Sequence, residues 1–323
     1  MSSGPTFSFA TTADDVATVF VDEIKGKNVL VTGTSLKSIG FETARVIAKY
    51  ANSVIISGYN AERFKSPFSR LRKKSHKRTI YALVLDLSSF ASVRKAAAEI
   101  NAQPEPLHVL INNAAASFVD FKLTEDGLET QLATDHVGPF LFTRLLTPKL
   151  LASATPAYTP RVVFVSSAAQ AIGTGVDFDA LENPDPAEYS KPLAYGQAKS
   201  ANCLTAIDLP KRSKGKINAY SLHPGVIFTN VYEKENSIPT LQSIGTLDEN
   251  KEAAAGIPFK TLPQGAATTI AAAFDPRLND QPGAFLDNST VANDQLAPHS
   301  SDPAKAEKLW NVTEKIIGES FVF

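Results

Sequence analysis

The fold of this chain is decided by residues 28–44, which read NVLVTGTSLKSIGFETA. An apolar run from Val29 to Val31 enters a turn that carries Gly33, and from Gly40 the chain continues with the apolar spacing of an amphipathic helix. A strand, a glycine-bearing turn and a helix in this order present backbone N–H groups and a helix N-terminus to a dinucleotide pyrophosphate. The stretch therefore predicts the first unit of a dinucleotide-binding fold.

Outward from this unit, strand-like and helix-like segments alternate along the chain. We expect strands at residues 28–32, 53–57, 79–85, 107–111, 161–166, 216–222 and 283–286. We expect helices at residues 40–50, 89–101, 125–150, 193–211, 264–274 and 303–318. This rhythm predicts an α/β protein with a single-domain Rossmann fold, a doubly wound parallel sheet of about seven strands with helices on both faces.

The expected domain spans residues 25–323, although length alone also allows two domains. Residues 1–24 are predicted to be an N-terminal extension with one short helix, capped near Thr12. Residues Asn230–Pro263 interrupt the rhythm, because they are dotted with Pro and Gly and only weakly periodic. A loop of this length is usually a lid or a binding segment, and the alternative is a disordered surface insertion.

Composition narrows the classes of function. The formal net charge of −1 gives no indication of a nucleic-acid or anionic-membrane partner. The single cysteine, Cys203, excludes an intrachain disulfide and fits a reducing compartment, so we expect a cytoplasmic protein. The sequence shows neither a secretory signal nor an apolar stretch of membrane-spanning length, so we expect no membrane span.

A pair of residues in the stretch 194–200, AYGQAKS, indicates acid–base chemistry. Tyr195 precedes Lys199 by four positions, which on a helix places both side chains on one face. A phenol ordinarily has a pKa near 10, and a neighbouring ammonium lowers the pKa of a phenol, so such a pair can exchange a proton with a substrate. Alone, the pattern is more often a solvated helical face, and its position among other motifs gives it weight.

Short polar motifs follow the expected strands. They are Leu85-Asp86-Leu87, Asn112-Asn113-Ala114, Ser166-Ser167-Ala168 and His223-Pro224-Gly225. Over residues 25–290 their order and spacing resemble the short-chain dehydrogenase/reductase family, and within it the retinol-dehydrogenase-like branch and its fungal relatives. The resemblance implies an oxidoreductase that interconverts a carbonyl and an alcohol by hydride transfer. It also assigns Asn230–Pro263 to closure over the substrate.

The resemblance further implies the catalytic roles. Tyr195 corresponds to the acid–base tyrosine, and Lys199 to the lysine that supports it and binds the nicotinamide ribose. Ser167 corresponds to the residue that binds the substrate oxygen and stabilises charge formed in the transition state. Asp135 departs from the pattern, because the branch usually has Asn there. A carboxylate loses the amide donor and adds a charge, so we expect an ion pair with Lys199, direct or through water, or competition with Tyr195 for the ammonium.

The cofactor contacts also come from the resemblance. They are expected at Gly33, Ser35, Lys37, Ser38, Ile39, Gly40, Tyr59, Asn60, Asp86, Leu87, Asn112, Ala114, Tyr195, Lys199, Pro224, Gly225 and Thr229. The glycine loop departs from the family, because it is one residue longer and Ser38 replaces its middle glycine. The sequence does not choose whether the side chain of Ser35, that of Ser38 or the backbone of Ile39 contacts phosphate.

The choice of cofactor depends on the residues around Tyr59. No acidic residue stands there for the adenosine ribose, as in NAD-preferring sites, and the arginine of many NADP-preferring relatives is missing. Lys37 occupies a position where such relatives often carry a basic residue, and Arg63 lies nearby. Lys37 therefore favours NADP(H) as the cofactor, with NAD(H) as the alternative. The interpretation of Lys37 without a function is an exposed lysine in a loop.

The first hypothesis is thus an NADP(H)-dependent carbonyl reductase for a small-molecule substrate, with a homo-oligomer suggested by analogy and no metal site. Phe118, Phe121, Phe140 and Tyr189 favour an apolar or aromatic substrate, although aromatic residues are also common in cores. The second hypothesis is a catalytically weak or silent dinucleotide-binding sensor or interaction protein, motivated by Asp135 and the irregular glycine loop. Sugar epimerisation is less favoured, because no second substrate domain is evident.

Overall fold

The computed structural model describes residues 5–60, 62, 66–67, 69–71, 79–232 and 236–323, so Arg63 lies outside the described residues. The strands are β1 (Asn28–Val31), β2 (Ser53–Gly58), β3 (Thr79–Val84), β4 (Val109–Asn112), β5 (Arg161–Val165), β6 (Asn218–Leu222), β7 (Val226–Ile227), β8 (Phe259–Lys260), β9 (Phe285–Asp287) and β10 (Thr290–Val291).

Eight of these strands form one sheet in the order β10-β9-β6-β5-β4-β1-β2-β3, and β7 and β8 form a separate parallel pair. The seven expected strands are all present in the large sheet and pair in parallel. The predicted doubly wound fold is therefore confirmed. β10 adds an eighth, antiparallel strand, which two residues were too few to reveal by periodicity.

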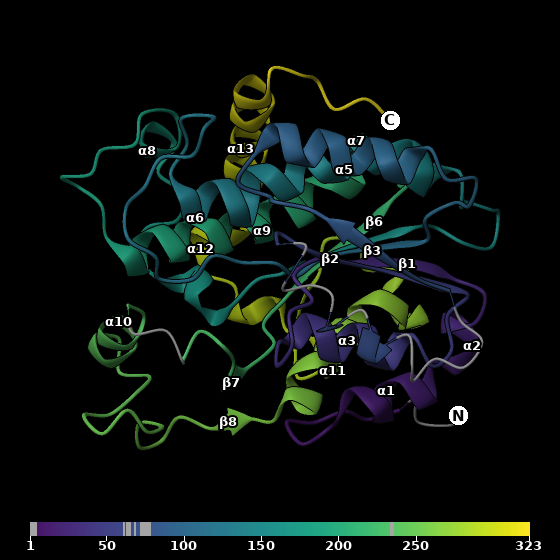
Figure 1. Cartoon of the computed structure of the whole chain (residues 1–323), viewed down its shortest axis with the longest axis horizontal. Coiled ribbons are helices and arrows are strands. Elements are labelled where there is room, and N and C mark those ends of the chain that lie inside the picture. The colour runs from purple at the N-terminus through teal and green to yellow at the C-terminus, as the bar shows by residue number, and fades with distance from the viewer. Residues whose placement is uncertain (1–4, 61, 63–65, 68, 72–78, 233–235) are drawn as a thin grey trace.

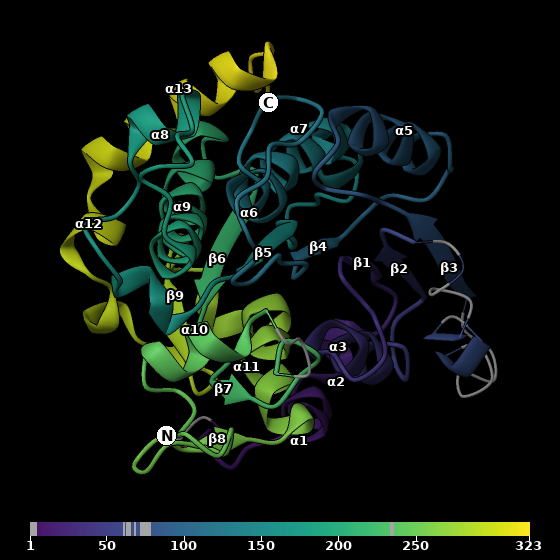
Figure 2. The same ribbon diagram turned by 60° about the vertical axis from the view of Figure 1, so that its left-hand side comes forward.

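Helices cover both faces of the sheet (Figures 1 and 2). They are α1 (Ala13–Val19), α2 (Val21–Ile24), α3 (Ile39–Ile47), α5 (Phe90–Asn101), α6 (Thr130–Leu132), α7 (Gly138–Leu151), α8 (Phe178–Glu182), α9 (Lys191–Arg212), α10 (Ile238–Ser243), α11 (Leu262–Phe274), α12 (Pro298–Ser301) and α13 (Pro303–Ile317). Leu30 packs with α5, α7, α9 and α13, whereas its neighbours Val29 and Val31 pack with α1, α3 and α11. This alternation follows from the two-residue period of a strand.

The helix expected at residues 125–150 begins later than predicted, at Thr130, so the predicted N-terminal end was wrong. The Glu129 carboxylate caps this end by accepting two backbone N–H groups of the first turn, at 2.8 and 2.9 Å. A π-helix, Ala133–Val137, then separates α6 from α7. Pro139 follows it and has no N–H to donate to an α-helical ladder. Single π-turns of this kind often occur at functional sites.

The loop expected at Asn230–Pro263 is shorter than predicted and contains structure of its own. Both α10 and β8 lie within it, and Pro263 belongs to the first turn of α11. The loop ends at Thr261, whose side chain accepts from the Gln264 N–H in a capping box. Elements of two to six residues carry no detectable periodicity, which explains why the sequence did not indicate them.

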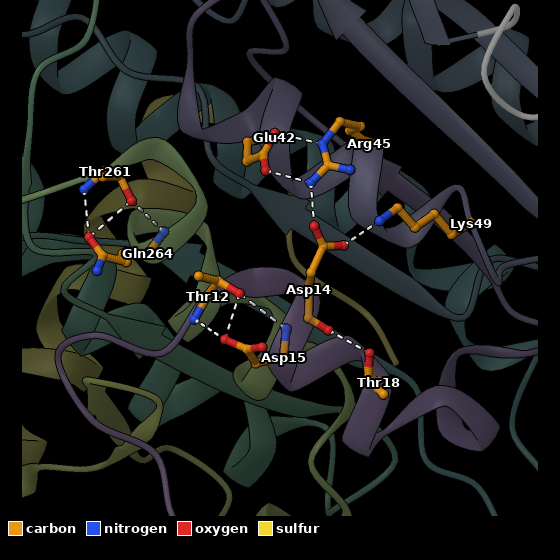
Figure 3. Close-up of polar contacts among 9 residues, drawn as sticks. All are labelled: Thr12, Asp14, Asp15, Thr18, Glu42, Arg45, Lys49, Thr261 and Gln264. Atoms are coloured by element: carbon orange, nitrogen blue, oxygen red, sulfur yellow. Dashed lines mark hydrogen bonds and ion pairs between the residues drawn. The ribbon is translucent and has the colours of Figure 1, made fainter.

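The N-terminal extension lies against α3 and α11 (Figure 3). The helix expected after Thr12 is present, and it starts with a capping box in which Thr12 and Asp15 exchange side chain-to-backbone hydrogen bonds at 3.2 and 2.9 Å. The Asp14 carboxylate pairs with Arg45 at 2.8 Å and with Lys49 at 2.5 Å, both on α3. The extension therefore ties the helix that follows the glycine loop to the helix that follows the Asn230–Thr261 loop.

At the opposite face, α13 packs beside the π-helix. The rings of Trp310 and Phe140 meet edge to face at 4.7 Å, and Phe140 is 1% exposed. The expectation that Phe140 lies near a substrate pocket is therefore wrong, since it belongs to the core. His136 Nε2 lies 2.9 Å from Thr313 Oγ1, whose own hydrogen is donated to the Leu309 carbonyl, so the His136 ring donates. Burial lowers the pKa of His136 to about 3.

We predict that His136 contributes to acid unfolding. The unfolded chain takes up a proton at this histidine below a pKa of 6.5, whereas the folded chain does so only near 3. Between these values the free energy of unfolding should fall with falling pH by up to about 1.4 kcal/mol per pH unit from this residue alone. His136→Gln keeps a donor for Thr313 but cannot titrate, so its slope in urea unfolding from pH 6.5 to 4.5 should be shallower. Equal slopes would contradict the prediction.

Candidate active site

The predicted acid–base residues converge at the carboxyl ends of β4, β5 and β6. Tyr195 and Lys199 lie one turn apart on α9, with Lys199 Nζ 5.2 Å from the centroid of the Tyr195 ring. Ser167 lies just beyond the end of β5, and Asp135 lies in the π-helix. Lys199 Nζ is 3.1 Å from Asp135 Oδ2 and 3.3 Å from the carbonyl oxygen of Val165. Lys199 is therefore the group through which the helix, the π-helix and β5 meet.

The Lys199–Asp135 ion pair is almost fully enclosed. The two side chains are 2% and 0% exposed, respectively. Burial by itself lowers the pKa of Lys199, but the charge and hydrogen bond of Asp135, together with the phenolate form of Tyr195, outweigh it and raise that pKa above its ordinary value. The ammonium therefore keeps its charge at neutral pH. Of the two arrangements expected from sequence, the structure contains the direct pair.

Asp135 has a second contact, which sequence did not indicate. Its Oδ1 accepts the backbone N–H of Ala116 at 2.6 Å, while its Oδ2 faces Lys199. The carboxylate thus holds the segment after β4 against α9. An asparagine would place an NH₂ group at one of the two oxygen positions, so in this geometry it could not accept from both the N–H and the ammonium.

Ser167 is held in a defined orientation. Its Oγ accepts the N–H of Ala169 at 3.1 Å, while the preceding Ser166 donates to the Lys199 carbonyl at 2.7 Å. Among the described residues, no acceptor takes the Ser167 hydroxyl hydrogen. This hydrogen is therefore available to a substrate oxygen, as a donor to developing negative charge requires.

Two glycines of the glycine loop are required by close contacts. At Gly33, whose φ is +70°, an added Cβ would lie 2.6 Å from the Cα of Ala114. At Gly40 an added Cβ would lie 2.3 Å from Asn113 Nδ2 and 2.7 Å from the Gly33 carbonyl oxygen. The loop and the end of β4 therefore pack backbone to backbone. Such a cradle fits the close approach of a dinucleotide to main-chain N–H groups.

Ser38 has a structural role at the start of α3. Its Oγ accepts the N–H of Phe41 at 3.1 Å and donates to the Ser35 carbonyl at 2.7 Å. The serine in place of the middle glycine is thus the N-cap of the helix, which begins with Ile39. Because the hydroxyl is engaged in capping, backbone N–H groups are the better candidates for phosphate contacts.

The other expected cofactor positions line the same edge of the sheet, but not all point outward. Lys37 and Tyr59 are exposed, Tyr59 to 63%, and Asp86 Oδ1 is engaged with the N–H and hydroxyl of Ser88. Leu87 is buried, and the Asn112 side chain donates inward to the Thr143 hydroxyl at 3.1 Å. At these last two positions the side chains are buried, so backbone atoms are the better candidates for contacts with a cofactor.

Sequence reasoning missed three polar residues that shape the site. Thr32 Oγ1 accepts the backbone N–H groups of Asn113 and Ala114, both at 3.0 Å. The Asn113 amide donates to the carbonyls of Thr32 at 2.8 Å and of Gly33 at 3.2 Å. Asn230 donates to the Leu36 carbonyl at 2.9 Å, which ties the start of its loop to the glycine loop. Thr32 and Asn113 belong to sequence motifs quoted above, and their place in these motifs was the only sequence feature that could have indicated their roles.

Apolar side chains cover the Tyr195 ring. This apolar cover consists of Phe118, Val231, Tyr232, Leu241, Leu247 and Phe259. The Phe118 and Tyr195 rings lie 4.7 Å apart, and Phe118 has a left-handed backbone with φ +55°. Phe121 and Tyr189 pack together nearby, at 5.3 Å, and the Tyr189 hydroxyl donates to the Val119 carbonyl. The surroundings of the tyrosine are thus apolar and partly aromatic.

The sequence matches known proteins along nearly its whole length. The sequence model of the family described as short chain dehydrogenase matches residues 27–176. Short-chain dehydrogenase TIC 32 A, chloroplastic, of Brassica napus is 34% identical over 318 residues, which cover 96% of this chain and 94% of the relative. Retinol dehydrogenase 12 of Homo sapiens is 33% identical over 298 residues, covering 92% and 88%.

Solved structures share the fold. A protein of Mycobacterium paratuberculosis superposes with a TM-score of 0.70 at 26% identity, over 93% of this chain and 96% of that chain. The NADPH-bound carbonyl reductase from chicken fatty liver superposes with a TM-score of 0.57 at 20% identity, over 83% and 99%.

Two kinds of feature are absent from the described part of the chain. None of its helices combines the length and the apolar character that crossing a membrane requires. Nor do its His, Cys, Asp and Glu side chains gather in groups of three or more that could hold a metal ion.

We predict that Asp135→Asn moves the basic limb of the kcat/KM profile to lower pH. The carboxylate offsets the ammonium charge that stabilises phenolate, and it sustains the raised pKa of Lys199. Its removal favours loss of a proton from either group, so the reactive protonation state should be lost at lower pH. Because asparagine leaves one buried donor unpaired, the free energy of unfolding should also fall by about 1–3 kcal/mol.

A matched control lies on α9, the helix that carries Lys199. Asp208→Asn removes the carboxylate that pairs at 2.5 Å with Arg212, which lies one turn after Asp208 on α9. It should leave the pH profile unchanged. A basic limb that shifts equally in both variants, or in neither, would contradict the role given to Asp135.

Proposed function

The chain belongs to the short-chain dehydrogenase/reductase family, and on that premise we propose that it is an NADP(H)-dependent oxidoreductase interconverting a carbonyl and an alcohol. We propose reduction of a ketone or aldehyde as its main direction. The observation that carries the proposal is the buried, charged Lys199 beside the ring of Tyr195, held by Asp135 and by the end of β5, from which Ser167 follows. The substrate would be a small apolar or aromatic molecule, in keeping with the apolar cover, and the location cytoplasmic.

In the proposed mechanism, a bound reduced nicotinamide supplies the hydride that the carbonyl carbon accepts. Ser167 donates a hydrogen bond to the carbonyl oxygen and orients it. Tyr195 transfers its hydroxyl proton to that oxygen as negative charge develops there. The ammonium of Lys199 stabilises the phenolate that remains. In the oxidative direction the same groups act in reverse, with the phenolate accepting the alcohol proton.

Lys199 has three N–H donors, and among the described residues two acceptors face them. One faces Asp135 and one the Val165 carbonyl, so a single donor remains for a ribose hydroxyl. Asp135 therefore restricts how the lysine can move, and it also reduces the net positive charge near Tyr195. The reduced positive charge near Tyr195 is the observation that favours the rival proposal, a catalytically weak or silent dinucleotide-binding protein. The irregular glycine loop no longer supports that rival, because Ser38 caps α3.

The proposed dinucleotide site comprises the backbone of Gly33 to Gly40 and the N-terminus of α3, with Asn60, Asp86 and Ala114 at its adenosine side. Pro224, Gly225 and Thr229 would border the nicotinamide. Gly225 has φ +95°, a backbone conformation that residues with a Cβ adopt only with strain, and an added Cβ would also displace the Lys260 side chain. The NADPH-bound relative of the same fold supports NADP(H), and NAD(H) stays the alternative cofactor.

We predict that Tyr195→Phe abolishes carbonyl reduction while NADPH binds nearly as before. The phenyl ring keeps its packing against Phe118 and loses only the hydroxyl. General acid catalysis contributes about 10²–10⁴-fold, so a variant that retains more than about a tenth of the wild-type kcat would rule out this role. Steady-state rates with aromatic ketones test it, and NADPH fluorescence titration with thermal melting controls for binding and folding. Wild-type protein that binds NADPH without any turnover would favour the silent alternative.

Lys37 gives a test of cofactor choice. We predict that Lys37→Ala weakens NADPH much more than NADH, because only NADPH carries the 2′-phosphate. Loss of one charge-assisted contact should cost about 1.5–3 kcal/mol of binding free energy. Fluorescence titration of both cofactors measures the difference.

Lys214→Ala is the control for this variant. Lys214 is also an exposed lysine with a left-handed backbone, φ +53° against +60° for Lys37, but it lies beyond the C-terminus of α9. The control therefore removes the same charge at the same backbone conformation and should leave both affinities unchanged. Equal weakening of NADPH and NADH by Lys37→Ala would argue against a 2′-phosphate contact.

A further inference from the structure

His223 links two segments of the proposed active site. It follows β6, and its backbone N–H donates to the Leu286 carbonyl at 2.9 Å. Its Nδ1 accepts the backbone N–H of Ala168 at 3.1 Å. Ala168 follows Ser167 in the chain, and Pro224 follows His223. The imidazole therefore joins the turn that carries the serine to the turn that begins at Pro224.

The hydrogen bond defines the protonation state of the ring. A backbone N–H can only donate, so His223 Nδ1 must carry a lone pair, and the proton of the neutral ring is on Nε2. Burial lowers the pKa of His223 to about 4. The charge of Asp287 opposes this shift and that of Lys260 adds to it. The lone pair thus persists at neutral pH.

The serine turn is anchored on both sides of Ser167. Before Ser167, the hydroxyl of Ser166 is bonded to the Lys199 carbonyl, which fixes that side to α9. After it, the Ala169 N–H bonds to Ser167 itself and orients the hydroxyl, while Gln170 bonds to Gln295 and Ser300 and so anchors the far end of the turn away from β6. The Ala168–His223 bond is the contact that connects this end of the turn to β6.

We propose that His223 is a positioning residue, which sets the place of the Ser167 hydroxyl relative to the segment from Pro224 to Thr229. This inference rests on the proposed function, in which Ser167 holds the substrate oxygen and that segment borders the nicotinamide. Hydride transfer requires the reacting atoms within about 3–3.5 Å of one another, and a displacement of about 1 Å can cost 10²-fold in rate. His223 acts on this alignment and touches neither substrate nor cofactor.

Two substitutions separate the acceptor from the bulk of the ring. His223→Leu removes the lone pair, whereas His223→Asn keeps an acceptor oxygen at the position of Nδ1. We expect the leucine variant to lose about tenfold or more in kcat, with the Kd for NADPH within about twofold of wild type. The asparagine variant should recover most of the lost rate. A leucine variant that melts like wild type and keeps its kcat would overturn the proposal, as would an asparagine variant no better than the leucine one.

A second measurement does not depend on activity. ¹⁵N NMR of the apo protein should show the His223 ring as the neutral tautomer with its proton on Nε2 between pH 5.5 and 8. A proton on Nδ1, or a cationic ring in this range, would overturn the proposal even in an active enzyme. Wild-type protein without turnover would instead count against the proposed function, and the NMR result would still decide whether His223 holds the serine turn.

Discussion

The active-site architecture depends on one constraint, the burial of a charged ammonium. Lys199 is 2% exposed, and a buried cation of this kind persists only when a counter-charge and hydrogen-bond acceptors compensate its lost hydration. Asp135 supplies the charge and the Val165 carbonyl supplies an acceptor. The lysine thereby fixes the π-helix and the end of β5 relative to α9. The proposed acid–base chemistry is a consequence of this compensation, because only a charged lysine stabilises a phenolate at Tyr195.

A second constraint acts at the glycine loop, and it is steric: side chains larger than hydrogen do not fit at two of its positions. Gly33 and Gly40 allow the loop to lie directly on the end of β4, and Thr32 and Asn113 join the two segments by hydrogen bonds. Asn230 extends this network to the loop that precedes α11. The proposed cofactor site and the proposed substrate loop are therefore in contact through polar groups of the protein itself.

Much of this could be predicted from sequence, for physical reasons that are local. The strands reveal themselves as apolar runs, and the spacing of Tyr195 and Lys199 places them on one face of a helix without knowledge of the fold. The capping role of Ser38 is also local, because its hydroxyl forms hydrogen bonds only with Ser35, Phe41 and Gly33 among the described residues. The bond between His223 and Ala168, by contrast, could not be predicted, because it joins residues 55 positions apart that the sheet topology brings together. Phe140 was misassigned for a similar reason: its burial depends on α13, about 170 residues away, and an aromatic side chain alone does not distinguish a pocket from a core.

The measurement that tests the central claim most directly is the fate of the hydride. The protein would be incubated with NADPH that carries deuterium at both C4 positions of the nicotinamide and with an aromatic ketone, and the alcohol would be analysed by mass spectrometry and NMR. The account predicts one deuterium on the carbinol carbon and none elsewhere, with consumption of one cofactor per alcohol. Saturating NADPH binding with no labelled alcohol across a panel of ketones and aldehydes would contradict the claim that the groups around Lys199 form a working oxidoreductase.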